Sequence, residues 1–193
     1  DKLWDTHTPQ NQYDLSLSLC GADGTSLDTA LPVRFGFREF WIDGRDFYLN
    51  GTRLYLSAIP LDNGQLGPTS ACYDGARATL QRYKSFGINF VYTHNYGCEP
   101  GAHISFEEVL RAADDEGFLV SFSQPHFGHY DWAAPDAGET NGYARHAEFY
   151  VRVAQNHPSV VCYSTSHNST GYAEDMNPDM IDGIQNPRDA WAL

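Results

Sequence analysis

The feature that most constrains the fold is an alternation of strand and helix patterns that begins near residue 54. Short apolar runs that predict strands cover residues 54–59, 88–92, 118–122 and 160–164. Between them, apolar residues at helical spacing predict helices over about residues 73–86, 105–117 and 141–155. Strands joined by helices of this length form right-handed βαβ units, so the sequence predicts an α/β fold with a parallel sheet.

The second predicted helix carries a signal at each end. Ser105 and Glu108 have the spacing of a capping box, in which the two side chains satisfy backbone N–H groups of the first turn. Gly117 follows the last apolar position and is expected to end the helix, because glycine readily adopts the left-handed conformation found there.

The first 56 residues follow a different pattern, with apolar and polar residues alternating at a period of two. This alternation runs through residues 13–19 and 33–42 and predicts half-buried strands. Asp43-Gly44 and Asn50-Gly51 are typical of tight hairpin turns. We therefore expect β structure with hairpin turns over residues 1 to about 56, with Trp41 packed inside it.

Charge and motif content exclude several functions. The chain has 25 Asp and Glu against 12 Lys and Arg, a net charge of −13, which argues against nucleic-acid binding because tracking phosphates requires surplus cations. No apolar run of about 18 residues is present and no signal peptide is recognisable at the start, so we expect no membrane partner, while the compartment stays open. The motifs G-x-G-x-x-G, G-x-x-x-x-G-K-[ST] and G-x-S-x-G are missing, and no cofactor is predicted.

The four cysteines lie far apart in the sequence, at Cys20, Cys72, Cys98 and Cys162. They form no C-x-x-C pair and are too few for a disulfide scaffold. We expect buried thiols, because a cysteine without a partner behaves as a small apolar residue.

Polar clusters follow three of the predicted parallel strands, at residues 93–96, 123–132 and 166–170. In parallel α/β folds, ligands bind beyond the carboxyl ends of the strands, so we expect these segments to line one rim. The candidate binding residues in this rim are His94, Asn95, His126, His129, Trp132, His167 and Asn168.

Five short segments are weakly informative alone but specific as an ordered set. They are Leu3-Trp4, Phe35-Gly36-Phe37-Arg38, Phe47-Tyr48-Leu49-Asn50-Gly51, Asp115-Glu116-Gly117-Phe118-Leu119-Val120 and Asn156-His157-Pro158-Ser159-Val160-Val161. Together they span nearly the whole chain, and in this order the chain resembles glycoside hydrolase family 2, the group of β-galactosidases and β-glucuronidases.

The resemblance implies a partial (β/α)8 TIM barrel, strands one to four, preceded by the last strands of an immunoglobulin-like β-sandwich. Residues 1–40 would be the C-terminal part of the sandwich, and residues 41–193 the N-terminal half of the catalytic barrel. It also implies that the complete protein hydrolyses O-glycosidic bonds in oligo- or polysaccharides, with a nucleophile on a later barrel strand.

The chain departs from the family pattern at three positions that are charged in the family. Asn168 stands at the place of the glutamate that acts as general acid/base, Tyr92 at the place of an arginine, and Ser123 at the place of a second glutamate. Retaining hydrolysis needs two carboxyl groups about 5–5.5 Å apart, and the chain offers no evident pair. Glu174 and Asp175 are the candidate proton donors, with a solvated acidic loop as the alternative.

The rim residues have more than one interpretation. The four histidines of the rim could hydrogen-bond sugar hydroxyls, ligate Zn²⁺ or serve only the structure, and the lack of an H-E-x-x-H motif favours the first over a metal site. Trp132 could stack on a sugar ring or belong to the core.

Three functional hypotheses stay open at this stage. The chain is part of a glycosidase, or it is a non-catalytic carbohydrate-binding or scaffold module that has lost the acid/base carboxylate. The third hypothesis is a homodimer formed through the exposed edges of a half-barrel.

Overall fold

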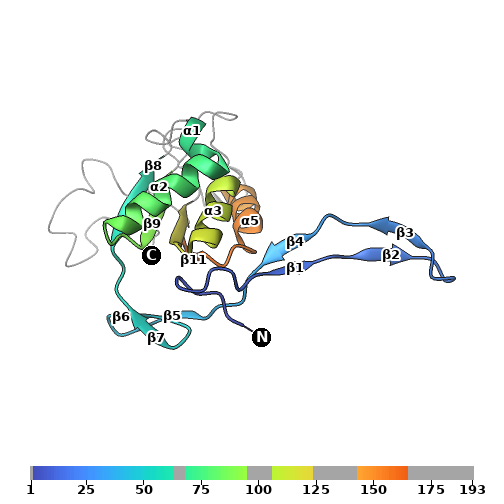
Figure 1. Cartoon of the computed structure of the whole chain (residues 1–193), viewed down its shortest axis with the longest axis horizontal. Coiled ribbons are helices and arrows are strands. Elements are labelled where there is room, and N and C mark those ends of the chain that lie inside the picture. The colour runs from blue at the N-terminus through green and yellow to red at the C-terminus, as the bar shows by residue number, and fades with distance from the viewer. Residues whose placement is uncertain (1, 63–67, 95–105, 124–142, 165–193) are drawn as a thin grey trace, which may run out of the picture.

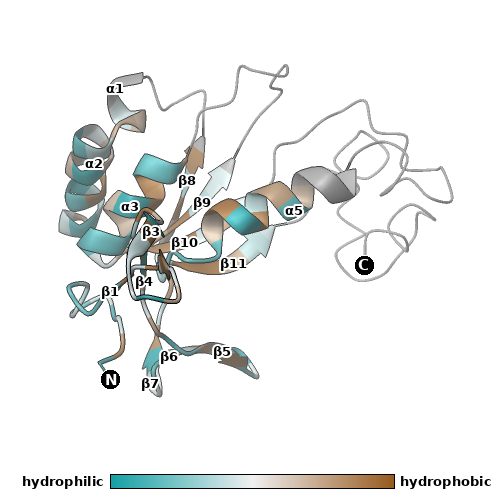
Figure 2. Cartoon of the chain, turned by 90° about the vertical axis from the view of Figure 1, so that its right-hand side faces the viewer, coloured by the Kyte–Doolittle hydropathy of each residue, from teal (hydrophilic) through white to brown (hydrophobic). Residues whose placement is uncertain are grey.

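The α/β part of the chain is a four-stranded parallel sheet with helices on one face (Figures 1 and 2). The computed structural model describes residues 2–62, 68–94, 106–123 and 143–164. The sheet contains β8 (Ala58–Asp62), β9 (Phe90–His94), β10 (Leu119–Ser123) and β11 (Val160–Ser164). The strand order is β11-β10-β9-β8 and every neighbouring pair is parallel, so the predicted parallel sheet is confirmed.

The helices lie between these strands in the chain, as the periodicity predicts. They are α1 (Pro68–Ala71), α2 (Tyr73–Ser85), α3 (Glu107–Glu116) and α5 (Tyr143–Ala154). Among the described helices, none combines the length and the apolar character needed to cross a bilayer.

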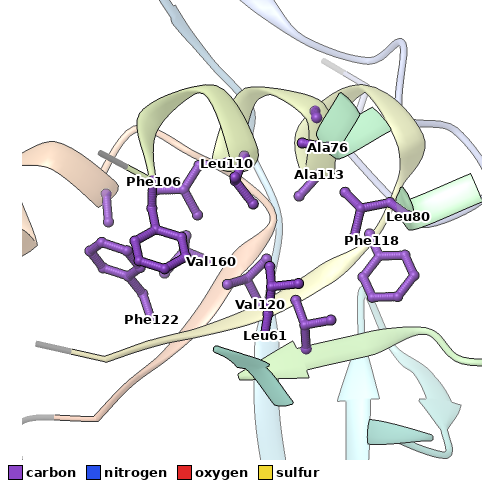
Figure 3. Close-up of a cluster of buried hydrophobic side chains, with 14 residues drawn as sticks. Leu61, Ala76, Leu80, Phe106, Leu110, Ala113, Phe118, Val120, Phe122 and Val160 are labelled. Atoms are coloured by element: carbon purple, nitrogen blue, oxygen red, sulfur yellow. The ribbon is translucent and has the colours of Figure 1, made fainter. Parts of the chain in front are cut away.

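The main core lies between the helices and one face of the sheet (Figure 3). Leu80 of α2 and Leu110 of α3 are almost fully buried, and they meet Val120 and Phe122 of the central strand β10. Burial of one such side chain stabilises the fold by about 1.5–3 kcal/mol. The apolar positions at helical spacing are therefore what attaches the helices to the sheet.

The two ends of α3 differ in how well the sequence describes them. Gly117 ends the helix in the left-handed conformation with φ +64°, as expected. At the other end, Phe106 and not the predicted Ser105 occupies the N-cap position, and the Phe106 side chain makes no capping hydrogen bond. Ser105 lies outside the described residues. Phe106 is buried in the core, so apolar packing holds the residue at which α3 begins.

The N-terminal residues form a long antiparallel arm that extends away from the α/β part (Figure 1). Its strands are β1 (Tyr13–Leu15), β2 (Ser18–Cys20), β3 (Ser26–Thr29) and β4 (Val33–Phe35). β1 pairs with β4 and β2 pairs with β3. The described residues of the arm form one hairpin and not two packed sheets, and Leu17, Leu27 and Leu31 on it are exposed.

A second antiparallel sheet follows the arm, made of β5 (Phe40–Asp43), β6 (Asp46–Leu49) and β7 (Thr52–Leu54). Its turns are the predicted ones, with positive φ at Gly44, Asn50 and Gly51. The predicted continuous strand over residues 33–42 is wrong, because β4 and β5 are separated at Gly36. A Cβ atom at Gly36 would lie 2.8 Å from the Pro158 Cγ, so the chain packs closely against a distant loop there.

Three further expectations are wrong. Residues 54–59 are not one strand, because Leu54 ends β7 in the antiparallel sheet and Ala58 begins β8 in the parallel one. Cys20 and Cys72 are exposed and not buried. Trp41 is 39% exposed. Each of these errors concerns the packing partner of a segment. Short-range sequence patterns do not contain that information.

Candidate functional site

The candidate site lies at the carboxyl end of the parallel sheet, where the last residues of its four strands lie side by side. Asp62, the last residue of β8, is in register with His94, the last residue of β9. Ser123 and Ser164 end β10 and β11 and are also in register with each other. Because all four strands run in the same direction, their carboxyl ends lie at the same end of the sheet (Figure 2).

Of the predicted binding and catalytic residues, only His94 belongs to the described part of the chain, at the end of β9. The others lie outside the described residues: Asn95, His126, His129, Trp132, His167, Asn168, Glu174 and Asp175. Their convergence with His94 stays a prediction. Convergence requires that the strands preceding the three polar segments end on the same side of the sheet. The parallel arrangement meets this requirement, whereas antiparallel neighbours would end on opposite sides.

Two buried polar residues join β9 to β10 at this edge. The backbone N–H of Ser123 donates a hydrogen bond of 2.8 Å to the Thr93 hydroxyl. Thr93 is fully buried and Ser123 is 2% exposed. Ser123 is the residue that the family resemblance aligns with a glutamate. Its buried environment suits a neutral group, because a charge without a partner would be strongly destabilised there. At this position the carboxyl end of the sheet therefore carries a hydroxyl group and not a carboxylate.

Asp62 is the strand-end residue that the sequence reasoning missed. The strand predicted over residues 54–59 stops at Ile59, whereas β8 continues through Pro60 to Asp62. The signal available in the sequence was the position of Asp62 at the end of the short apolar run over residues 58–61. Its register with His94 adds a carboxylate-bearing residue to this edge.

Two residues on β11 provide neutral groups near the site. Burial raises the pKa of the Tyr163 phenol, and the nearby Arg38 guanidinium opposes this only in part. Burial likewise raises the pKa of the Cys162 thiol. At neutral pH both side chains are protonated, so Tyr163 can donate a hydrogen bond and Cys162 is a poor nucleophile.

Arg38 holds the amino end of β11 in place. Its Nε donates to the Pro158 carbonyl oxygen at 3.1 Å, and its Nη2 donates to the Val160 carbonyl oxygen. Burial lowers the pKa of the guanidinium, which nevertheless stays charged at neutral pH. A charged donor on these two carbonyl groups determines where β11 starts and hence where it ends at the site.

Asp114 makes a second connection to the same loop. Its Oδ2 lies 2.6 Å from the His157 Nδ1, and its Oδ1 accepts a hydrogen bond from the Ser159 backbone N–H at 3.1 Å. Its backbone carbonyl oxygen accepts from the Trp4 indole at 2.9 Å. The carboxylate is buried, so these partners replace the water that it would otherwise bind.

The five segments that carry the family resemblance meet at the amino end of the sheet, opposite the candidate site. Trp4, Gly36 and Pro158 are packed together there, and the Asn50 side chain donates to the Trp4 carbonyl oxygen at 2.8 Å. These segments therefore hold the arm, the second sheet and β11 against one another. They are informative about the fold and carry no site chemistry.

A cleft of about 330 Å³ also lies at this amino end, between the N-terminal segment, the β6–β7 hairpin and the segment before β9. Thr6, Thr52 and Asn89 are among the residues that line it. In parallel α/β folds chemistry is concentrated at the carboxyl ends, so this cleft is not the candidate site.

Comparison with known proteins shows which solved structures share this fold. No family model matches the sequence, and no curated protein matches it. Solved structures do match. A β-glucuronidase from Ruminococcus gnavus, in complex with C6-substituted uronic isofagomine, is similar over 91% of this chain and 29% of its own, at 23% identity and a TM-score of 0.65.

Two further structures give the same result. The Amycolatopsis orientalis exo-chitosanase matches 80% of this chain and 18% of its own, at 23% identity and a TM-score of 0.58. A GH2 β-galacturonidase from Eisenbergiella tayi, bound to galacturonate, matches 84% and 27%, at 21% identity and a TM-score of 0.61. The chain therefore spans less than a third of the length of these proteins. The resemblance to glycoside hydrolase family 2 is confirmed for the fold.

Proposed function

We propose that this chain is part of a carbohydrate-active enzyme that hydrolyses O-glycosidic bonds in oligo- or polysaccharides. The observation that carries the proposal is that the carboxyl ends of β8, β9, β10 and β11 lie at the same end of one parallel sheet. The predicted polar segments follow three of these strands in the sequence. The likeness in fold to glycoside hydrolases supports it.

In this proposal the rim residues bind the sugar through neutral hydrogen-bonding groups. The residues that would hold hydroxyl groups are His94, Asn95, His126, His129, His167 and Asn168. Trp132 would stack on the apolar face of a sugar ring. Either Glu174 or Asp175 would donate the proton to the leaving oxygen, because Asn168 has no proton to give.

The experiment is turnover of glycosides by the full-length protein and by its Glu174→Gln and Asp175→Asn variants. Loss of a general acid slows hydrolysis by about 10²–10⁴-fold. The loss is expected to be larger for a disaccharide than for a nitrophenyl glycoside, because nitrophenolate leaves without a proton. Glu148→Gln, on the exposed face of α5, is the matched control and should keep full activity. Equal rates for all variants would remove both acids from the mechanism.

The second candidate is a carbohydrate-binding or scaffold module without catalysis. The neutral, buried Ser123 at a family glutamate position favours it. Isothermal titration against a glycan panel, together with an absence of turnover of the same glycans, would establish this alternative over hydrolysis.

A further inference from the structure

The three-stranded sheet β5–β7 has two chemically different faces. Phe40 and Phe47 stack on one face with ring centroids 6.1 Å apart. Leu49 and Leu54 extend this face into the buried cluster around Trp4. Phe40, Leu49 and Leu54 of this face attach the sheet to the rest of the molecule, so the residues on the opposite face are not needed for that purpose.

The opposite face presents a row of three residues across the strands. Trp41 is in register with Tyr48, and Tyr48 with Arg53, so the three side chains share one face. The Trp41 and Tyr48 rings are nearly parallel, at 6°, with centroids 5.3 Å apart. Trp41 is 39% exposed. Both views show this sheet standing apart from the helices (Figures 1 and 2).

Charged side chains surround the aromatic pair. The Arg53 Nη2 lies 2.7 Å from the Asp46 Oδ1. Asp43 faces Asp46 across the same strand pair and is exposed. Donors and acceptors of hydrogen bonds therefore lie directly beside an exposed aromatic surface, and Asp46 already neutralises the charge of Arg53.

We propose that this face, made by Trp41, Tyr48, Asp43, Asp46 and Arg53, is a second sugar-binding surface that holds an uncharged polysaccharide chain. The C–H face of a sugar ring stacks on an aromatic ring, while its hydroxyl groups hydrogen-bond to carboxylates and guanidinium. An acidic polysaccharide is disfavoured, because the only cation of the five residues is paired and the two aspartates would repel it.

The composition of the face favours a polysaccharide over a protein partner. The centre of a protein interface is depleted of charge and excludes water from its apolar anchors. Here charged residues occupy the positions next to the aromatic pair, and no aliphatic side chain belongs to this row. The hydroxyl groups of a polysaccharide can hydrogen-bond to these charged residues, whereas the apolar centre of a protein interface cannot.

This surface is separate from the strand-end site. The antiparallel sheet precedes the amino end of β8, whereas the candidate catalytic edge is at the carboxyl end. Binding here would keep a polymer near the enzyme without contact with the reacting bond. The two proposals can therefore fail independently.

The test is native affinity electrophoresis of the full-length protein through gels that contain β-glucan, galactomannan, xyloglucan, arabinogalactan or polygalacturonate. At least one neutral polymer is expected to slow the protein, and Trp41→Leu is expected to weaken that binding about three- to tenfold. Trp41→Phe keeps a ring and should retain part of it. Phe86→Leu, an exposed aromatic residue at the end of α2, is the matched control and should bind as the original protein does.

Turnover of a nitrophenyl glycoside is measured in parallel. Trp41→Leu should leave it unchanged, whereas His94→Ala should lower it and leave the retardation intact. Circular dichroism checks folding, and Tyr48→Leu replaces Trp41→Leu if the latter unfolds. No retardation by any neutral polymer, retardation by polygalacturonate alone, or equal retardation of the original protein and the aromatic variants would overturn the proposal.

Discussion

Asp114 shows how a single side chain connects segments that are distant in the sequence. It lies in α3 and contacts His157 and Ser159 through its carboxylate and Trp4 through its carbonyl oxygen. Charge-assisted hydrogen bonds of a buried carboxylate contribute more than those between neutral groups. The residue therefore stabilises the position of β11, which leads to the candidate site.

We expect Asp114→Asn to lower the free energy of unfolding by about 1.5–3 kcal/mol, because the bond to His157 loses its charge while the neighbouring groups stay buried. Urea unfolding measures the change. Asp28→Asn, on the exposed arm, is the control and should change stability by less than about 0.5 kcal/mol. Equal stability of Asp114→Asn and the original protein would contradict the role assigned to the carboxylate.

Cys162 offers a test of local electrostatics. Burial raises the pKa of its thiol, and Arg38 acts in the opposite direction. Since the thiolate is the reactive form, alkylation by iodoacetamide at pH 8 should be slower at Cys162 than at the exposed Cys20, and it should accelerate as the pH rises above 9. Peptide mapping by mass spectrometry resolves the two sites. Faster reaction at Cys162 than at Cys20 would contradict a raised pKa of the Cys162 thiol.

At the scale of elements, the end of α3 is the most demanding junction. Gly117 adopts φ +64°, and a Cβ atom there would clash with the Thr6 carbonyl oxygen. Gly44 has a similar φ, +61°, but no atom lies within 4 Å of the position that its Cβ would occupy. Both positions require a positive φ, but only Gly117 also lacks room for a side chain. Substitution of the two glycines therefore distinguishes the cost of the backbone conformation from the cost of the clash.

Gly44→Ala is expected to cost about 1–2 kcal/mol, the penalty of the left-handed conformation. Gly117→Ala adds a backbone clash and is expected to cost about 2–5 kcal/mol. Thermal or urea unfolding of both variants measures the difference. Similar losses in the two variants would mean that the N-terminal segment moves away from Gly117 without cost.

At the scale of the whole molecule, the parallel sheet ends at β8 on one side and at β11 on the other within the described residues. Edge strands expose unpaired backbone groups, which favours pairing with another chain. The isolated 193-residue chain is therefore expected to form a homodimer through these edges. Light scattering should give twice the 21.6 kDa of one chain, and a mass of one chain at micromolar concentration would contradict it.

The sequence by itself determined the order and type of most elements. The α/β alternation, the turns at Gly44 and Gly51 and the end of α3 at Gly117 were all predicted correctly. These features depend on side-chain periodicity and on the backbone freedom of single residues, which are local properties. The direction of the strands followed from the same local pattern, and with it the expectation of one common edge.

Only the tertiary structure decided which residues are buried and where elements begin. The exposure of Trp41, the division between β7 and β8, and the start of α3 at a buried phenylalanine depend on packing partners far along the chain. So does the meeting of Trp4, Arg38 and Asp114 around the loop before β11. A contact between residues more than 40 positions apart leaves no periodic trace in either segment, because each side chain meets its partner only after the chain has folded.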